Sequence, residues 1–304
     1  MYLFNVQLNN ERDWENVFQS ITTFTPLVEH ILNIEKLPSV NIENLSPGTN
    51  AVFKIGKYVI KIFAPMESKV EQRLPQTEVF ATQHIHRLGI SASNVIAHGL
   101  VKDKYNFAYI IFEYVEDILA KTFDTMAEAE KMNIGRKLRE ITDRMNTPCE
   151  SFNDIDIMND RSRDRCWDRY SEKFKQERLA YIKSHNYGEK VFVHGDLCGD
   201  NLLLTPHNEL YIIDFADALL APKAFEHALL AIESELDPMI LRGYFENDTV
   251  DDFIETCLSG ILLYGDFETV EELLYNPDDY NTIDDLRKTI RRKIKIYVPT
   301  DIRH

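Results

Sequence analysis

Residues 193–204 read VHGDLCGDNLLL and residues 210–217 read LYIIDFAD, and these two runs decide how the second half of the chain folds. The apolar runs 202–204 and 210–213 have the residue types of two short strands, and residues 205–208 supply turn chemistry between them. The sequence therefore predicts a hairpin, with Asn201 before its first strand and Asp214 after its second. Because outer ends of paired antiparallel strands are neighbours, we expect Asn201 and Asp214 to lie close together.

The spacing of the polar residues in this stretch is typical of a phosphotransfer site. Asp196 precedes Asn201 by five positions, and Asp214 ends the following strand. In that pattern Asp196 orients the acceptor hydroxyl and accepts its proton, whereas Asn201 and Asp214 offer oxygen ligands to Mg²⁺. His194 is expected to pack beneath this loop rather than to act as a base. The alternative is a surface hairpin with ordinary turn carboxylates, which a His-Gly-Asp tripeptide alone would favour.

Length and composition indicate an ordinary globular protein. The chain has 304 residues, enough for two lobes, and no apolar run approaches the roughly 20 residues of a membrane helix. The first ten residues lack the positive and apolar regions of a signal peptide. The four cysteines are scattered without paired spacing, which argues against a zinc site and a disulfide framework and for a reducing compartment. We therefore expect a cytoplasmic protein without a membrane partner.

Negative charge is concentrated in the second part of the chain. Residues 1–115 carry 11 acidic and 10 basic residues, and residues 116–304 carry 39 acidic and 24 basic residues, a balance of -15. Such a field repels nucleic acid and attracts a polycation. The simpler reading is a surface that keeps the protein soluble. A basic run at residues 287–295 is expected to be a solvated helix face rather than a nucleic-acid site. Residues proposed for an acidic surface are Glu233, Glu235, Asp237, Asp248, Asp251, Asp252 and Glu255.

The order of predicted elements divides the chain in two. Helical spacing appears in residues 11–33, where Pro26 is expected in the first turn of the second stretch, and then a strand pattern dominates residues 40–63. Further predicted elements are a helix over 75–88, a strand over 107–112, and helices over 127–145, 164–185, 225–234, 239–245, 250–264, 270–275 and 283–296. This order predicts an α+β protein with a nucleotide-binding lobe at 1–115 and a catalytic and acceptor-binding lobe at 116–304.

The predicted first lobe contains candidate nucleotide contacts. Lys61 lies on a strand between Ile60 and Ile62, so its side chain is expected on the opposite face from theirs. Glu78, on the following helix, is favoured over Glu71 as its partner. The segment 46–50 has one glycine, and its backbone amides and polar side chains are candidates to hold phosphates. The further candidate donor-binding residues are Ser46, Thr49, Asn50 and, for backbone pairing with the base, Glu113 and Val115.

These residues resemble the aminoglycoside phosphotransferase/choline kinase-like family, small-molecule kinases with a two-lobed protein-kinase-like fold. The resemblance covers about residues 40 to 235 and rests on His194 to Asn201 and on Ile213-Asp214-Phe215. Protein kinases carry Arg where Gly195 stands, which favours a small acceptor. The chain departs from the family pattern at Glu226-His227, where the family often has Asp-Leu.

The resemblance implies Mg²⁺-dependent transfer of the γ-phosphoryl group of ATP or GTP to a hydroxyl. An aminoglycoside is the leading acceptor because a polycation suits the acidic second part. Alternatives are a metabolite such as a sugar, choline or homoserine, and a different class altogether: a pseudokinase that binds nucleotide without turnover. No oligomeric state is predicted.

Overall fold

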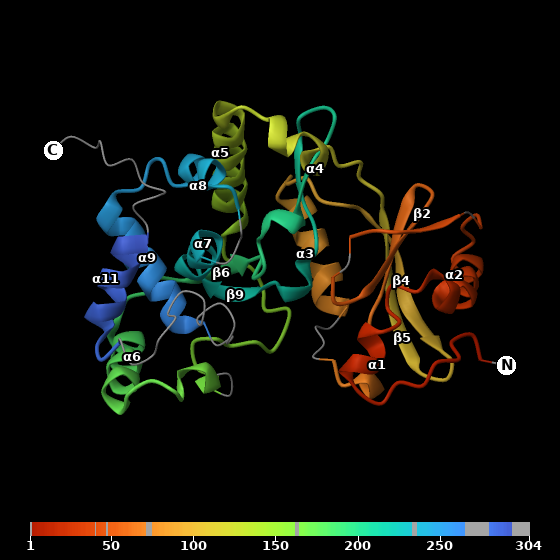
Figure 1. Cartoon of the computed structure of the whole chain (residues 1–304), viewed down its shortest axis with the longest axis horizontal. Coiled ribbons are helices and arrows are strands. Elements are labelled where there is room, and N and C mark those ends of the chain that lie inside the picture. The colour runs from red at the N-terminus through yellow and green to blue at the C-terminus, as the bar shows by residue number, and fades with distance from the viewer. Residues whose placement is uncertain are drawn as a thin grey trace. The chain divides into compact units, whose positions relative to one another are not determined.

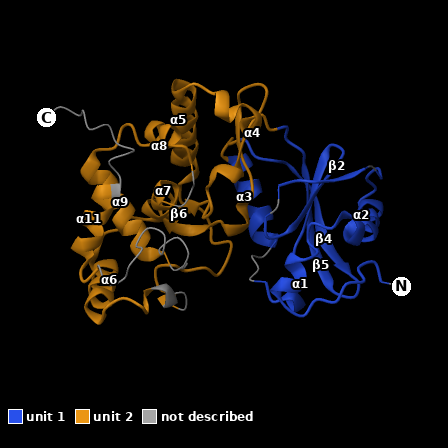
Figure 2. Ribbon diagram, viewed as in Figure 1, with its two compact units in different colours: residues 1–87, 91–116 blue, residues 88–90, 117–304 orange. Residues whose placement is uncertain are grey.

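The computed structural model describes residues 2–39, 41–46, 48–70, 75–161, 164–232, 236–264 and 280–293. The chain divides into two compact units, one formed by residues 1–87 and 91–116 and the other by residues 88–90 and 117–304 (Figure 2). Within the described ranges no helix is both long and apolar enough to cross a membrane.

The first unit is built on a five-stranded antiparallel sheet (Figure 1). Its spatial order is β1-β2-β3-β5-β4. The strands are β1 (Ile42–Asn44), β2 (Ala51–Ile55), β3 (Tyr58–Ile62), β4 (Val95–Lys102) and β5 (Asn106–Glu113). No strand was predicted at β4, which lies at the edge of the sheet; it alternates mainly between half-buried and exposed residues and so carries no continuous apolar signal.

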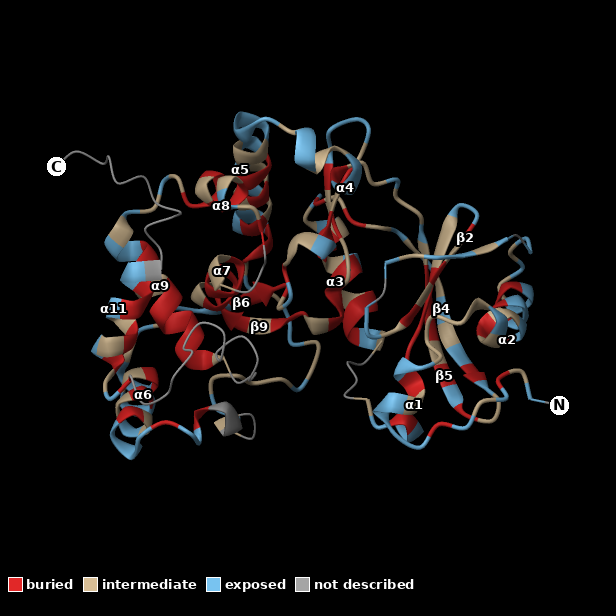
Figure 3. Ribbon diagram, in the orientation of Figure 1, coloured by how far each residue is buried: buried red, intermediate tan, exposed pale blue. Residues whose placement is uncertain are grey.

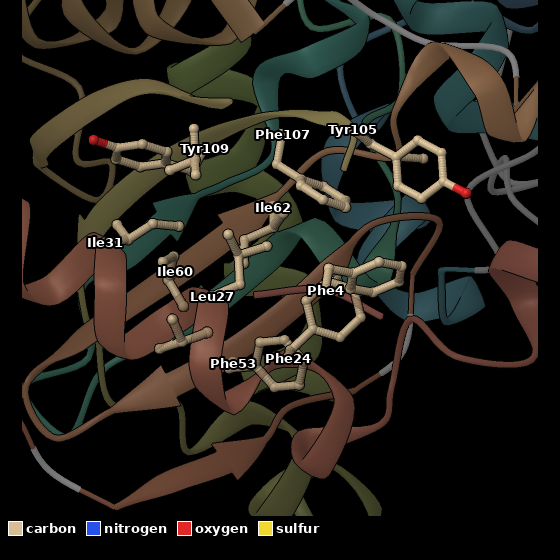
Figure 4. Packing of buried hydrophobic residues seen from close by; sticks show 14 of the residues in the cluster. Phe4, Phe24, Leu27, Ile31, Phe53, Ile60, Ile62, Tyr105, Phe107 and Tyr109 are labelled. Carbon is tan, nitrogen blue, oxygen red and sulfur yellow. The ribbon is translucent and has the colours of Figure 1, made fainter. Parts of the chain in front are cut away.

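Helices cover this sheet from both faces. On one face α2 (Ile21–Ile34) packs Phe24 and Leu27 against β2, β3 and β5, as the side chains in Figure 4 show. On the other face α3 (Pro75–Arg87) contributes Val79 to a small cluster with Phe63 and Ile110. The alternation of side chains along β3 therefore sends neighbouring residues to different helices.

The predicted helical stretch at 11–33 forms two helices, α1 (Glu11–Glu15) and α2. The expectation that Pro26 lies in the first turn is wrong, because Ser20 caps α2 by accepting a hydrogen bond from the Thr23 N–H and the helix begins at Ile21. Pro26 therefore lies inside the helix, where it provides no N–H for the carbonyl four residues earlier.

The second unit is mainly helical and contains two small antiparallel sheets. Strand β6 (Lys190–Val193) pairs with β9 (Leu219–Pro222), and β7 (Leu202–Leu204) pairs with β8 (Leu210–Ile212). The β7–β8 hairpin is the predicted one. Figure 3 shows β6 and β9 almost entirely buried. The described α-helices of this unit are α4 (Leu119–Thr122), α5 (Glu128–Met145), α6 (Glu172–Ser184), α7 (Lys223–Ile232), α8 (Pro238–Tyr244), α9 (Val250–Leu263) and α11 (Ile283–Lys293).

The α+β prediction is confirmed, but one predicted helix is divided into two elements and another cannot be compared. The single helix expected over 164–185 is a short 3-10 turn, Asp164–Trp167, followed by α6, because the Ser171 side chain caps α6 by accepting a hydrogen bond from the Phe174 N–H. The helix expected over 270–275 lies outside the described residues.

Candidate active site

The loop that carries Asp196 connects the two small sheets of the second unit. It leaves the buried strand β6 at Val193 and enters β7 at Leu202, with a 3-10 turn over Gly199–Asn201. Both ends of the loop are therefore held by paired strands, so its length and direction are fixed by the sheets that it joins.

The side chain of His194 joins this loop to the end of the β7–β8 hairpin. Its side chain is completely buried, and its Nε2 lies 2.9 Å from the carbonyl oxygen of Ile213. Its Nδ1 accepts a hydrogen bond of 3.2 Å from the backbone N–H of Asp196. Because a carbonyl accepts and an N–H donates, Nε2 carries the hydrogen and Nδ1 the lone pair. The ring is thus committed at both nitrogens to backbone groups, as expected of a residue that shapes the loop.

Asn201 and Asp196 lie in direct contact. The Asn201 Nδ2 donates to the backbone oxygen of Asp196 at 2.7 Å and to its Oδ2 at 3.1 Å. These bonds orient the carboxylate and also use the nitrogen of the Asn201 amide, so the chemistry left to this side chain is that of its acceptor oxygen.

Asp214 follows the hairpin as predicted. The backbone N–H of Ile213 donates to the carbonyl oxygen of Asn201 at 3.0 Å, so the two outer ends of the hairpin are held together. Asp214 itself has φ 60° and ψ 65°, the left-handed conformation, which is uncommon for a residue with a side chain. Such conformations persist where the surrounding structure holds them, and they are concentrated at functional sites.

Gly195 has a structural reason for being glycine. Its φ is +83°, and a Cβ built there would lie 2.2 Å from the carbonyl oxygen of Asp217. A larger residue in this position would displace the segment that follows Asp214. The loop therefore passes closer to the 215–217 turn than any side chain would permit.

Glu226 is a site residue that we did not predict. It lies on α7, is fully buried, and its Oε2 accepts a 2.5 Å hydrogen bond from the backbone N–H of His194. Burial raises the pKa of Glu226 to about 7, although hydrogen bonds from the backbone of His194 and Gly195 and from the Asn146 side chain act in the opposite direction. The sequence does place this carboxylate among the apolar residues of α7, which indicates a buried acid with a polar partner. Its partners could not be identified from the sequence because they lie far away in the chain.

The first unit contains the predicted Lys61–Glu78 pair. Lys61 Nζ lies 2.9 Å from Glu78 Oε2, and the two side chains are 6% and 2% exposed. Ile60 and Ile62 belong to the core against α2, so Lys61 faces the α3 side as expected. Glu71, the alternative partner, lies outside the described residues.

The remaining donor-binding candidates also lie in the first unit. Ser46 and Thr49 are exposed and Asn50 is half-buried, in the segment between β1 and β2. At the end of β5, Glu113 is exposed and Val115 half-buried. The N–H of Glu113 donates to Asn94 at 2.8 Å and the N–H of Tyr114 to Lys57 at 3.0 Å, so these two donors are already used by the protein.

The structure describes five of the seven carboxylates that the sequence proposed for an acidic surface, and none of the five is fully buried. Those on α9 and beside α8 are paired with basic residues or cap a helix, and Glu233 and Glu235 lie outside the described residues. The pairs are Asp237 with Lys131, Asp248 with Arg139, Asp251 with Arg291 and Glu255 with Arg287, and Asp252 bonds Thr249 at the start of α9. Much of this charge is therefore balanced locally. Two of the basic partners come from the 287–295 run, whose helix α11 packs beside α9.

Comparison with known proteins identifies the family. Residues 46–255 match the model of the phosphotransferase enzyme family, so the chain belongs to this family. It is a small-molecule phosphotransferase with a kinase-like fold.

Solved structures share this fold at low sequence identity. The choline kinase LicA from Streptococcus pneumoniae is 16% identical, with TM-score 0.54 over 87% of this chain and 96% of that one. The GDP and kanamycin complex of APH(2")-IIia is 17% identical, with TM-score 0.56 over 89% and 97%. The microcompartment-associated aminopropanol kinase is 13% identical, with TM-score 0.53 over 88% and 97%.

Proposed function

We propose that the protein transfers the γ-phosphoryl group of ATP or GTP to a hydroxyl of a small molecule, and that Asp196 orients this hydroxyl and accepts its proton. The observation that supports this role is the set of hydrogen bonds around Asp196. The Asn201 amide donates to its carboxylate and to its backbone carbonyl, and the His194 ring accepts a hydrogen bond from its backbone N–H. Phosphoryl transfer depends on positioning more than on covalent chemistry, so a fixed carboxylate is the feature that the reaction requires.

Asn201 and Asp214 are the proposed Mg²⁺ ligands. The donor bonds of Asn201 leave its oxygen as the group to face a cation, and Asp214 supplies a carboxylate from the adjoining end of the hairpin. Hard cations prefer oxygen ligands, so this pair fits Mg²⁺ with phosphate oxygens completing its coordination.

The first unit is proposed to bind the nucleotide. Lys61, buried and aligned by Glu78, would neutralise phosphate charge, and Ser46, Thr49 and Asn50 would contact phosphates through backbone and side-chain groups. The base would pair with backbone groups in the Glu113–Val115 segment other than the two N–H groups already bonded.

The proposed acceptor is a hydroxylated amine, with aminoglycosides tested first. Residues 116–304 carry an excess of 15 negative charges even though the α9 carboxylates are paired. The named ligand or acceptor of each similar structure described above, kanamycin, choline or aminopropanol, carries a cationic nitrogen together with a hydroxyl group. A cation is therefore the acceptor that the charge of this chain favours.

The experiment is a coupled assay of nucleoside diphosphate release with ATP or GTP and Mg²⁺. The acceptor panel contains aminoglycosides, choline, aminopropanol, homoserine and simple sugars. With the active acceptor, Asp196→Asn should lower kcat about 10²- to 10⁴-fold, because it keeps the shape of the side chain and removes the base. Its melting temperature is the control for folding.

The outcomes separate the alternatives. Turnover of an amine acceptor by the wild-type protein, with little turnover by Asp196→Asn, supports the proposal. Turnover of a sugar alone would show that the acceptor is not an amine, while the phosphotransfer reaction would stand. Retained turnover in Asp196→Asn contradicts the role of Asp196. Nucleotide binding without turnover on any acceptor favours the pseudokinase alternative.

A further inference from the structure

Trp14 on helix α1 contacts the loop between β1 and β2. Its indole Nε1 donates a 2.8 Å hydrogen bond to the carbonyl oxygen of Thr49, 35 residues away in the chain. The Trp14 side chain is 1% exposed, whereas Thr49 is exposed. An indole has one donor and no acceptor, so this carbonyl satisfies the polar group of a ring that is otherwise in the core. Trp14 also lies before residues 46–255, the part of the chain that matches the family.

The contact fixes the orientation of a peptide group in the loop. The Thr49–Asn50 peptide is trans, so the carbonyl of Thr49 and the N–H of Asn50 point in opposite directions. Since the carbonyl is turned toward the buried indole, the N–H of Asn50 points away from it. The segment 46–50 contains no lysine or arginine, so the donors that it can offer to an anion are its backbone amides and the side chains of Ser46, Thr49 and Asn50.

The indole itself is held by an aromatic group in the core. Its ring stacks on Phe18 at 6.4 Å between centroids and meets the edge of Phe24 at 5.8 Å. Phe24 in turn packs against Phe53 of β2 at 5.5 Å, and both are labelled in Figure 4. The loop is thus fastened to the same core that holds the strand following it. Because the indole is packed in the core, its N–H group has a fixed position and holds the Thr49 carbonyl in one orientation.

We infer that Trp14 is a positioning residue for the donor nucleotide: it turns the Thr49–Asn50 peptide so that the Asn50 N–H is presented to the phosphates. The inference rests on the proposed function, in which residues 46–50 contact the nucleotide. Trp14 acts through Thr49 and touches no substrate. With this role for Trp14, the residues that support nucleotide binding include one on helix α1, which precedes residues 46–255, the part of the chain that matches the family.

Trp14→Phe tests this role because it keeps an aromatic ring and removes only the donor and part of the ring area. The chain provides a matched control, since its other tryptophan, Trp167, is also 1% exposed and donates its Nε1 to a backbone carbonyl, that of Tyr264, at 3.0 Å. Trp167 belongs to the second unit, whereas segment 46–50 belongs to the first. Trp167→Phe is therefore the same chemical change at a site without the proposed role.

Loss of one hydrogen bond should raise the nucleotide KM and the nucleotide Kd of Trp14→Phe about two- to tenfold, with the acceptor KM unchanged. Trp167→Phe should leave the nucleotide constants at their wild-type values, whatever it does to the melting temperature. Fluorescence gives a second readout independent of turnover. In Trp167→Phe the remaining indole is Trp14, and its emission should change on addition of ADP; in Trp14→Phe the emission of Trp167 should stay constant.

Equal nucleotide constants in Trp14→Phe and wild type, or equal losses in both variants, would overturn the inference while leaving the kinase proposal in place. Failure of the wild-type protein to bind ATP or GTP by calorimetry would overturn the proposed function, and this inference with it. A rise in acceptor KM alone would likewise contradict a role at the donor.

Discussion

Replacing Glu226 by Gln should lower activity and at the same time relieve an unfavourable buried charge. Glu226 lies under the loop that carries Asp196 and receives the N–H of His194 at 2.5 Å, with the N–H of Gly195 also acting on its carboxylate. Gln has nearly the same shape but no charge, so the hydrogen bond that it accepts from the His194 N–H is weaker than the one that the carboxylate accepts. The loop would lose part of its anchor without losing packing.

The expected sizes follow from these contacts. A hydrogen bond to a charged group contributes about 1.5–3 kcal/mol and one between neutral groups about 0.5–1.5 kcal/mol. The loss of the charge therefore corresponds to about a 5- to 12-fold fall in kcat if the whole difference bears on the transition state. The pKa of Glu226 is raised from 4.5 to about 7 in the folded protein. Because the folded state holds this proton more tightly, the resulting stability is fully present below pH 4.5 and is lost as the pH rises through 7. The size of that loss is about 3 kcal/mol.

The assay therefore has two parts. Nucleoside diphosphate release gives kcat for both proteins at pH 8, and denaturant unfolding gives their stabilities between pH 5 and 8. We expect the variant to be slower, and we expect wild-type stability to fall with rising pH relative to that of Glu226→Gln. A variant with wild-type kcat and a parallel pH profile of stability would refute the reasoning, because it would show that Glu226 neither anchors the loop nor carries a raised pKa.

Two further substitutions test other contacts. Gly195→Ala should destabilise the protein by about 1–3 kcal/mol and lower kcat, since its Cβ would lie 2.2 Å from the Asp217 carbonyl, whereas Gly188→Ala, at φ +71° with nothing within 4 Å, should show only the smaller backbone cost. Unfolding and activity measurements on both variants check this, and equal losses would contradict the steric explanation. Lys61→Met leaves the buried Glu78 carboxylate without its 2.9 Å partner, so it should lower the free energy of unfolding by about 3–5 kcal/mol and weaken ATP binding, as measured by unfolding and calorimetry. Wild-type ATP affinity in this variant would exclude Lys61 from the nucleotide site.

Local patterns were sufficient where short-range chemistry decides the structure. The runs 202–204 and 210–213 with a turn between them specify the β7–β8 hairpin, and the hairpin alone brings the backbones of Asn201 and Ile213 together. The contact of Asn201 with Asp196 spans five residues, so the motif itself contains it. Lys61 and Glu78 were paired correctly because strand alternation and the following helix restrict the choice.

Long-range pairing decided what the sequence did not reveal. Strand β4 is recognisable through its pairing with β5, since its own residues alternate without a continuous apolar run. The carboxylates of α9 were proposed for an acidic surface from the sequence, and the structure adds that Glu255 and Asp251 bond Arg287 and Arg291, which lie 32 and 40 residues away in the chain. The net charge of a segment can be counted from its sequence. Whether that charge is neutralised by ion pairs depends on which helix packs beside the segment in the folded protein.

The amino-acid sequence by itself determined the α+β class and the phosphotransfer motif, because hydrophobic period, turn residues and motif spacing act over a few positions. Only the tertiary structure placed Glu226 under His194, 32 residues earlier, and Trp14 against Thr49, 35 residues later. Those contacts satisfy buried polar groups whose partners come from distant segments. A buried carboxylate or indole needs a partner wherever the chain supplies one, and the letters near it do not say which partner that is.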